Sequence, residues 1–97
     1  MAIRFEWDVR KDAENQRKHG VSFEEAETVF SDDAARLIDD PDHSSTEDRF
    51  VLLGLSIRLR VLLVVHAYYE NDEVIRIISA RRANRQERAP YDGRWAR

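Results

Sequence analysis

Residues 49–68 read RFVLLGLSIRLRVLLVVHAY, and this stretch decides the fold. Arg49 to Ser56 and Arg60 to Tyr68 are rich in valine, leucine and aromatic residues, which favour strands. The two runs flank a short connection near Ile57 and Arg58. Such an arrangement predicts a β-hairpin, and the rest of the fold is expected to assemble around it.

The segments before the hairpin predict a strand and two helices. Ile3 to Trp7 alternates apolar and polar residues, as a half-buried strand does. Asp8 is expected to cap a helix over Val9 to His19, which Gly20 ends. The spacing of Ser22-Phe-Glu-Glu25 is that of a capping box and predicts the start of a second helix.

The remaining segments complete the expected order β-α-α-β-β-β-β-α. Ala35 to Ile38 is a short strand candidate, and Val74 to Ser79 predicts the last strand. A closing helix is expected from Ala80 to about Ala89, stopped by Pro90. Strands joined by short turns pair antiparallel, and helices must cover a sheet face. The pattern therefore predicts an α+β fold with a single antiparallel β-sheet and helices packed on one face.

Composition limits the class of protein. With 97 residues the chain is expected to form a single domain over residues 1–97. It has no cysteine, which excludes disulfides and thiolate metal sites and favours a reducing cytoplasm. No apolar run approaches the ~20 residues of a membrane span. The three histidines, His19, His43 and His66, lack metal-ligand spacing, so neither a metal nor another cofactor is expected.

Charge is distributed unevenly along the chain. Residues 1–48 hold 6 Lys and Arg against 14 Asp and Glu, whereas residues 49–97 hold 10 against 5. All ten cations of the second half are arginine, which suits bidentate recognition of phosphate. This asymmetry points to a phosphate-rich ligand or an oppositely charged partner, although a scattered solvated surface would give the same counts.

The expected closing helix places Arg81, Arg85 and Arg88 on one face, with Arg76 and Arg82 nearby. Like charges at this spacing repel, so an anion is expected to offset them. The anion is either a phosphodiester ligand or the acidic first half of the same chain.

Three other residues suggest chemistry. Glu47 and Arg49 share one strand face, either as a surface salt bridge or as a carboxylate and a guanidinium in a cleft. His19 lies at a helix C-terminus, where a histidine is favoured by the helix dipole. Its ordinary pKa near neutrality would also suit proton transfer.

Several motifs together resemble those of the BrnT toxin family. They are Phe5-Glu-Trp-Asp8, Lys11, Asn15, KHGVSFEEA at residues 18–26, Glu47-Asp-Arg49, Gly54, IRIISARRA at residues 75–83, Glu87-Arg88 and Tyr91. The resemblance implies a RelE-like ribonuclease toxin of a type II toxin–antitoxin pair that inhibits translation. It also implies a BrnA-like antitoxin with a ribbon-helix-helix DNA-binding part, which represses the operon in complex with the toxin. The RelE-like fold agrees with the element order derived above.

Metal-free RNA cleavage assigns expected roles to these residues. Arg49 and Arg81 suit stabilisation of the phosphorane, because arginine is a poor proton donor. Proton transfer falls to His19, Glu47, Lys18 or Tyr91, with Glu47 or His19 favoured as the base. RNA contacts are expected from Lys18, Arg76, Arg82, Arg85 and Arg88. The alternative is a non-catalytic RNA-binding or co-repressor module, which would need no Glu47 and His19 pair.

Overall fold

The computed structural model describes residues 3–39 and 48–93. Its elements are β1 (Arg4–Glu6), α1 (Val9–His19), α2 (Phe23–Thr28), the 3₁₀ turn η1 (Val29–Ser31), β2 (Arg36–Ile38), β3 (Phe50–Leu55), β4 (Val61–Tyr69), β5 (Val74–Arg82) and α3 (Ala89–Asp92). The strands form one five-stranded sheet in the order β1-β5-β4-β3-β2. The α+β class and the central β3–β4 hairpin are confirmed.

One strand pairing differs from the expected all-antiparallel sheet. The β2–β3, β3–β4 and β4–β5 pairs are antiparallel, whereas β1 is parallel to β5, with Phe5 opposite Ile75. The prediction of antiparallel pairing rests on short turns between strands. That argument does not apply to β1, because no short turn joins β1 to its partner. Two helices follow β1, and it pairs with β5, near the other end of the described residues. The sheet is therefore mixed.

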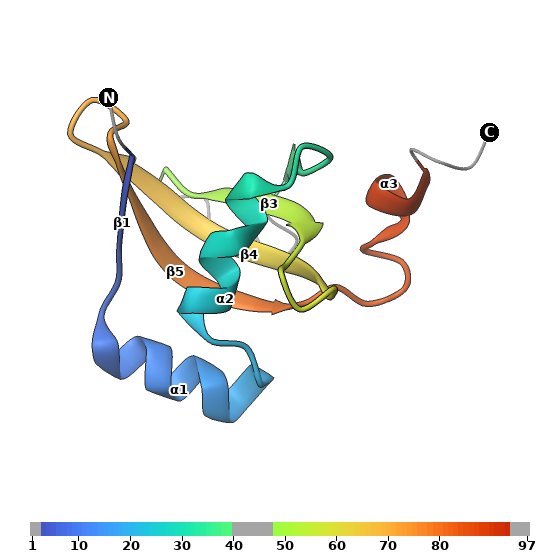
Figure 1. Ribbon diagram of the computed structural model, residues 1–97, viewed down its shortest axis with the longest axis horizontal. Helices are drawn as coiled ribbons and strands as arrows, with labels where there is room; N and C mark the ends of the chain where they lie inside the picture. The colour runs from blue at the N-terminus through green and yellow to red at the C-terminus, as the bar shows by residue number, and fades with distance from the viewer. Residues whose placement is uncertain (1–2, 40–47, 94–97) are drawn as a thin grey trace.

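The sheet has a core on each face. On the first face α2 packs over the sheet, with α1 along the edge of β5 (Figure 1), and Phe23, Leu62 and Ile77 lie in that core. On the second face Val51, Leu53 and Leu63 form a smaller cluster with residues that include Tyr91 of α3. The helices were expected on one face only. The short α3 instead lies against the second face through Tyr91, because the apolar side chains of the hairpin alternate between both faces.

The helix termini follow the sequence signals. The Asp8 carboxylate accepts hydrogen bonds from the backbone N–H groups of Arg10 and Lys11, and the Ser22 hydroxyl accepts one from that of Glu25. Gly20 ends α1 with a φ of 70°, a left-handed conformation that glycine adopts without strain. No helix of the described residues is long and apolar enough to cross a membrane.

The expected helix from Ala80 to Ala89 is wrong. β5 continues through Arg82, because Leu62 and Val64 of β4 extend the antiparallel ladder to Arg82 and Ala80. The next turn begins instead at Asn84, whose side chain accepts a hydrogen bond from the backbone N–H of Glu87 at 2.8 Å. Pro90 does not end a helix but lies in the first turn of α3, where its missing N–H costs nothing.

Gly54 allows β3 to lie close to the segment that follows α2. A Cβ atom at this position would stand only 2.8 Å from the Cβ atom of Ala35 and 2.8 Å from a methyl carbon of Val29. Only glycine fits without displacing these neighbours. The close approach also lets the Asp32 carboxylate accept a hydrogen bond from the backbone N–H of Leu55 at 2.8 Å.

The tip of the β3–β4 hairpin contains a strained residue. Leu59 has a φ of 64° and its side chain is 78% exposed. The left-handed region disfavours a residue with a branched apolar side chain, whereas asparagine tolerates it. We expect Leu59→Asn to raise the free energy of unfolding by about 0.5–1 kcal/mol, measured by urea denaturation. A loss of stability would show that the Leu59 side chain contributes packing that its exposure does not reveal.

Candidate active site

Three of the predicted arginines belong to the second face of the sheet. Arg81 lies opposite Leu63 in the β4–β5 ladder, and Leu63 belongs to the second-face cluster. Arg76 lies five residues earlier, a spacing that would put it on the opposite face of a regular strand. A β-bulge between the two residues adds one position, so both lie on this face. Arg49 directly precedes β3 and comes two residues before Val51, so extending the alternation of this strand by one residue gives it the same face. The sheet thus places Arg49, Arg76 and Arg81 on one side.

Arg81 is held by a bidentate ion pair. Its two terminal nitrogens donate to the two carboxylate oxygens of Glu87, each at 2.8 Å, and both side chains are largely buried. The Glu87 carboxylate also accepts a hydrogen bond from the backbone N–H of Asn84 at 2.9 Å. The hydrogen bonds from Arg81 lower the pKa of Glu87, and burial opposes them only partly. This pairing fixes the plane of the Arg81 guanidinium.

Tyr91 joins α3 to the second face. Its ring packs in the cluster of Val51 and Leu63, and the side chain is buried. Its hydroxyl donates a hydrogen bond of 2.8 Å to the Asp32 carboxylate. Tyr91 is therefore a well-fixed residue at the edge of the arginine face, and the Asp32 oxygen is positioned to influence its proton.

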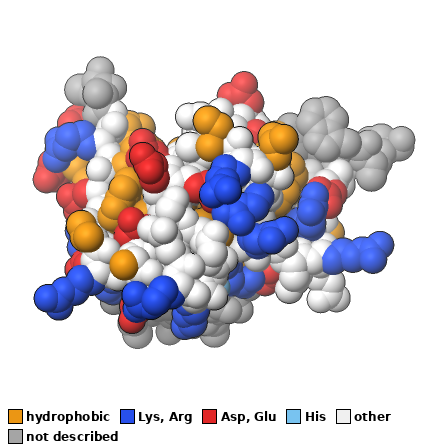
Figure 2. All heavy atoms as spheres, turned by 60° about the horizontal axis from the view of Figure 1, so that its bottom comes forward, with side chains coloured by type: hydrophobic (Ala, Val, Ile, Leu, Met, Phe, Trp, Pro, Cys, Tyr) orange, Lys and Arg blue, Asp and Glu red, His pale blue; other side chains and the backbone are white. Residues whose placement is uncertain are grey.

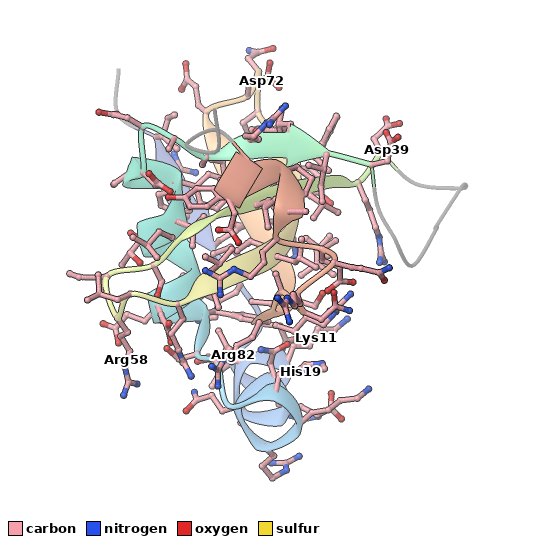
Figure 3. The ribbon with its side chains drawn as sticks, turned by 90° about the vertical axis from the view of Figure 1, so that its right-hand side faces the viewer. Lys11, His19, Asp39, Arg58, Asp72 and Arg82 are labelled. Carbon is pink, nitrogen blue, oxygen red and sulfur yellow. The ribbon has the colours of Figure 1, made fainter. Side chains whose placement is uncertain are left out.

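Lys18, His19 and Arg82 lie elsewhere. Lys18 and His19 line a shallow groove of about 300 Å³ between α1 and the outer edge of β5, together with Ser79. Arg82 pairs with Leu62 and so points to the first face. In Figure 3, His19 and Arg82 both lie at the α1 end of the molecule. Figure 2 shows several Lys and Arg side chains grouped on the side seen from this end.

The other predicted residues are dispersed or lie outside the described residues. Arg85 and Arg88 are exposed in the turn before α3, and Arg88 pairs with Asp92 at 2.9 Å. Arg81, Arg85 and Arg88 do not share a helix face, because Arg81 is in a strand. Glu47 and His43 are outside the described residues. Within residues 3–39 and 48–93, no three His, Asp or Glu side chains are arranged to hold a metal ion.

The matching family model covers most of the chain. The family described as "Ribonuclease toxin, BrnT, of type II toxin-antitoxin system" matches residues 7–87. The chain belongs to the BrnT family. Its matched region contains α1, α2, the whole of the hairpin and β5, and it includes Arg49, Arg76, Arg81 and Glu87.

The fold of this BrnT family member is also found in a crystal structure. The chain is similar to the ribonuclease toxin BrnT of Brucella abortus, with a TM-score of 0.66 and 23% sequence identity. The match covers 87% of this chain and 100% of the Brucella chain. The curated proteins contain no match.

Asn15 is a BrnT-family motif residue for which sequence analysis suggested no role. Its side chain is buried and pairs with the backbone of Ala80, donating to the carbonyl at 2.7 Å and accepting from the N–H at 3.2 Å. It also donates to the carbonyl of Val21 at 2.8 Å. Asn15 thereby takes the place of a neighbouring strand beside Ala80, and it fixes α1 to the residue that precedes Arg81. Its place in the BrnT family motif is the sequence signal that could have revealed it.

His66 is a buried histidine that packs among aromatic side chains of the core. Its ring contacts those of Phe30, Phe50 and Tyr68. The Nδ1 atom lies 3.0 Å from the carbonyl oxygen of Val64, which can only accept, so Nδ1 carries the proton. Burial lowers the pKa of His66, with a smaller opposing effect of the Val64 carbonyl. His66 is therefore a neutral core residue, remote from the arginine face.

Proposed function

We propose that this ribonuclease toxin cleaves RNA without a metal ion, through attack of the RNA 2′-OH on the adjacent phosphodiester. The placement of Arg49, Arg76 and Arg81 on one sheet face carries the proposal. Guanidinium groups suit the doubly charged phosphorane that forms during this attack, because they offer positive charge and several hydrogen-bond donors. The products would be a 2′,3′-cyclic phosphate and a 5′-OH.

Arg81 is the best supported of the proposed catalytic residues. Its pairing with Glu87 orients the guanidinium before substrate arrives, so no reorganisation is needed during the reaction. Arg49 has the same proposed role. Arg76, which pairs with Glu6 at 2.8 Å, is proposed to bind a neighbouring phosphate. Phosphate contacts farther along the RNA are proposed for Lys18, Arg82, Arg85 and Arg88.

Glu47, His19 and Tyr91 are the residues proposed to transfer protons. Glu47 or His19 would remove the 2′-OH proton as the new P–O bond forms. Tyr91, or whichever of Glu47 and His19 is not the base, would give a proton to the 5′-oxygen as the P–O5′ bond breaks. The hydrogen bond from Tyr91 to Asp32 orders the phenol next to the arginine face. His19 lies in the groove beside β5, so RNA would have to pass over the edge of this strand to reach both His19 and Arg81.

The partner of the toxin is proposed to be a BrnA-like antitoxin. The type II class implies an antitoxin that binds the toxin directly. We propose that the antitoxin has a ribbon-helix-helix part, that operator DNA is contacted only through the complex, and that the complex represses its own operon. Cleavage of cytoplasmic RNA would then inhibit translation whenever the antitoxin is depleted.

The proposed chemistry predicts that cleavage persists in excess EDTA. We expect equal single-turnover rates with EDTA and with Mg²⁺ at matched ionic strength, because arginines supply the positive charge. The substrate is a short RNA whose products are resolved by gel and assigned by end-group analysis. A matched RNA with a single 2′-deoxy sugar at the cleavage site should remain intact, because it lacks the nucleophile. Loss of activity on chelation that is restored by a divalent ion would overturn metal independence.

A further inference from the structure

A groove runs beside α2. It has a volume of about 580 Å³ and extends from β1 past α2 and η1 to the tip of the β3–β4 hairpin. Its apolar lining comes from Phe5, Leu55 and Ile57. None of the residues proposed to touch RNA lines it.

The charged residues of this groove are acidic. Glu24, Glu27 and Asp32 line it, and no Lys or Arg is among its lining residues in the part of the chain that the structure describes. Asp32 is already hydrogen-bonded to Tyr91 and to Leu55, whereas Glu24 is exposed on the surface of α2. Carboxylates would repel a phosphate backbone, so the groove is suited to a cationic partner and not to RNA.

The hairpin tip beside the groove exposes two large apolar side chains. Ile57 and Leu59 are 75% and 78% exposed. In Figure 3 Arg58, between them, extends away from the body of the protein. The backbone N–H of Ile57 donates to the Thr28 hydroxyl of α2 at 2.9 Å, which joins the tip to the groove wall. Large exposed apolar side chains on a well-fixed backbone are typical of a protein contact.

We propose that the α2 groove, with the hairpin tip, is the anchoring site for a basic, apolar segment of the antitoxin. The inference rests on the antitoxin partner of the proposed function. Apolar side chains of the segment would fill the space between Phe5 and Ile57, and its Lys or Arg side chains would meet Glu24 and Glu27. Because neither Arg49 nor Arg81 lines the groove, this contact supplies affinity without itself covering the catalytic arginines.

The test compares antitoxin affinity with RNA cleavage in the same variants. The probe is the full-length antitoxin encoded with the toxin, titrated calorimetrically into full-length toxin. We expect Glu24→Lys combined with Glu27→Lys to raise the Kd at least about 30-fold, because like charges would face each other across the contact. Ile57→Asn, at an exposed position that tolerates polar residues, should weaken binding without affecting the fold.

The control for added positive charge is Glu70→Lys, in the β4–β5 turn and not among the residues that line the groove; it changes the net charge by half as much as the double lysine variant. The Glu70 side chain forms an exposed ion pair with Arg4 at 3.2 Å. This variant should bind the antitoxin within about threefold of the wild type. All variants should cleave RNA at the wild-type rate when the antitoxin is absent. Unchanged antitoxin affinity in both groove variants would overturn the site while leaving the ribonuclease intact.

Two further outcomes are distinguishable. Sedimentation of the toxin alone reports whether a second copy occupies the groove. A wild-type dimer that is lost in the double lysine variant, with antitoxin affinity unchanged, would assign the groove to self-association and overturn the proposal. Failure of the wild-type toxin to bind the antitoxin at all would overturn the proposed partner and this site together.

Discussion

Arg81→Ala is expected to slow RNA cleavage by ~10²–10³ under single-turnover conditions, because one well-aimed donor to the phosphorane is worth ~3–4 kcal/mol. Affinity for RNA should fall much less, since the other arginines still supply charge. Arg81→Lys keeps the charge but loses the bidentate fork, so an intermediate rate is expected. The measurement is the cleavage rate at saturating toxin beside the Kd for a non-cleavable 2′-deoxy analogue.

Arg82→Ala is the matched comparison for Arg81→Ala. The two residues are adjacent in β5 but belong to opposite faces of the sheet. Arg82→Ala should raise the half-saturating toxin concentration and lower the salt dependence of binding by a little under one unit of slope. Its rate at saturation should stay near that of the wild type. Equal rates for both variants at saturation would show that the second face is not the active site.

The largest expected effect on stability comes from Glu25. Its side chain is almost fully buried and accepts hydrogen bonds from the Ser56 hydroxyl at 2.6 Å and from the Arg60 Nε atom at 3.0 Å. A second Arg60 nitrogen also bonds to it. Removing one partner of a buried ion pair leaves the other charge without its counterion. Glu25→Ala should therefore lower the free energy of unfolding by about 3–5 kcal/mol. Thermal unfolding should show a Tm lower by on the order of 12 °C or more.

The same ion pair predicts a dependence of stability on pH. Burial raises the pKa of Glu25, but the hydrogen bonds from Arg60 and Ser56 together outweigh it and hold the pKa below its ordinary 4.5. The carboxylate thus contributes stability fully above that value, and the contribution is lost as the pH falls through the lower folded pKa. Glu25→Gln should therefore lose less stability than the wild type on acidification from about pH 5. The exposed neighbour Glu24, replaced by glutamine, should behave like the wild type.

Local signals predicted much of this fold. The β3–β4 hairpin, the caps at Asp8 and Ser22 and the glycine at the end of α1 depend on neighbouring residues, and all were found where expected. Predictions that needed distant partners were weaker. The parallel pairing of β1 cannot be deduced from turn lengths, and the extension of β5 through Arg82 depends on the length of β4.

In the candidate site too, the sequence identified individual residues better than it predicted which of them lie together. The sequence predicted that Arg49 and Arg81 matter, but it grouped Arg81 with Arg85 and Arg88 on a helix that does not exist. Glu25 was expected to complete a capping box at Ser22. Its backbone N–H donates to the Ser22 hydroxyl, which is one half of the box, but its carboxylate is bound to Arg60, which lies 35 residues away. Asn84 and Glu87 have capping-box spacing too, and that signal marks where the strand has ended.

The parallel β1–β5 pairing also sets the order in which the protein can fold. β1 and Asn15 of α1 both require β5, the last strand to be synthesised. The N-terminal helices cannot be fixed to a complete sheet until Val74–Arg82 has been made, and contacts of such long sequence separation form slowly. An incomplete chain, such as one translated from a severed message, therefore contains neither the finished core nor Arg81. We therefore expect ribonuclease activity only after Val74–Arg82 has been synthesised.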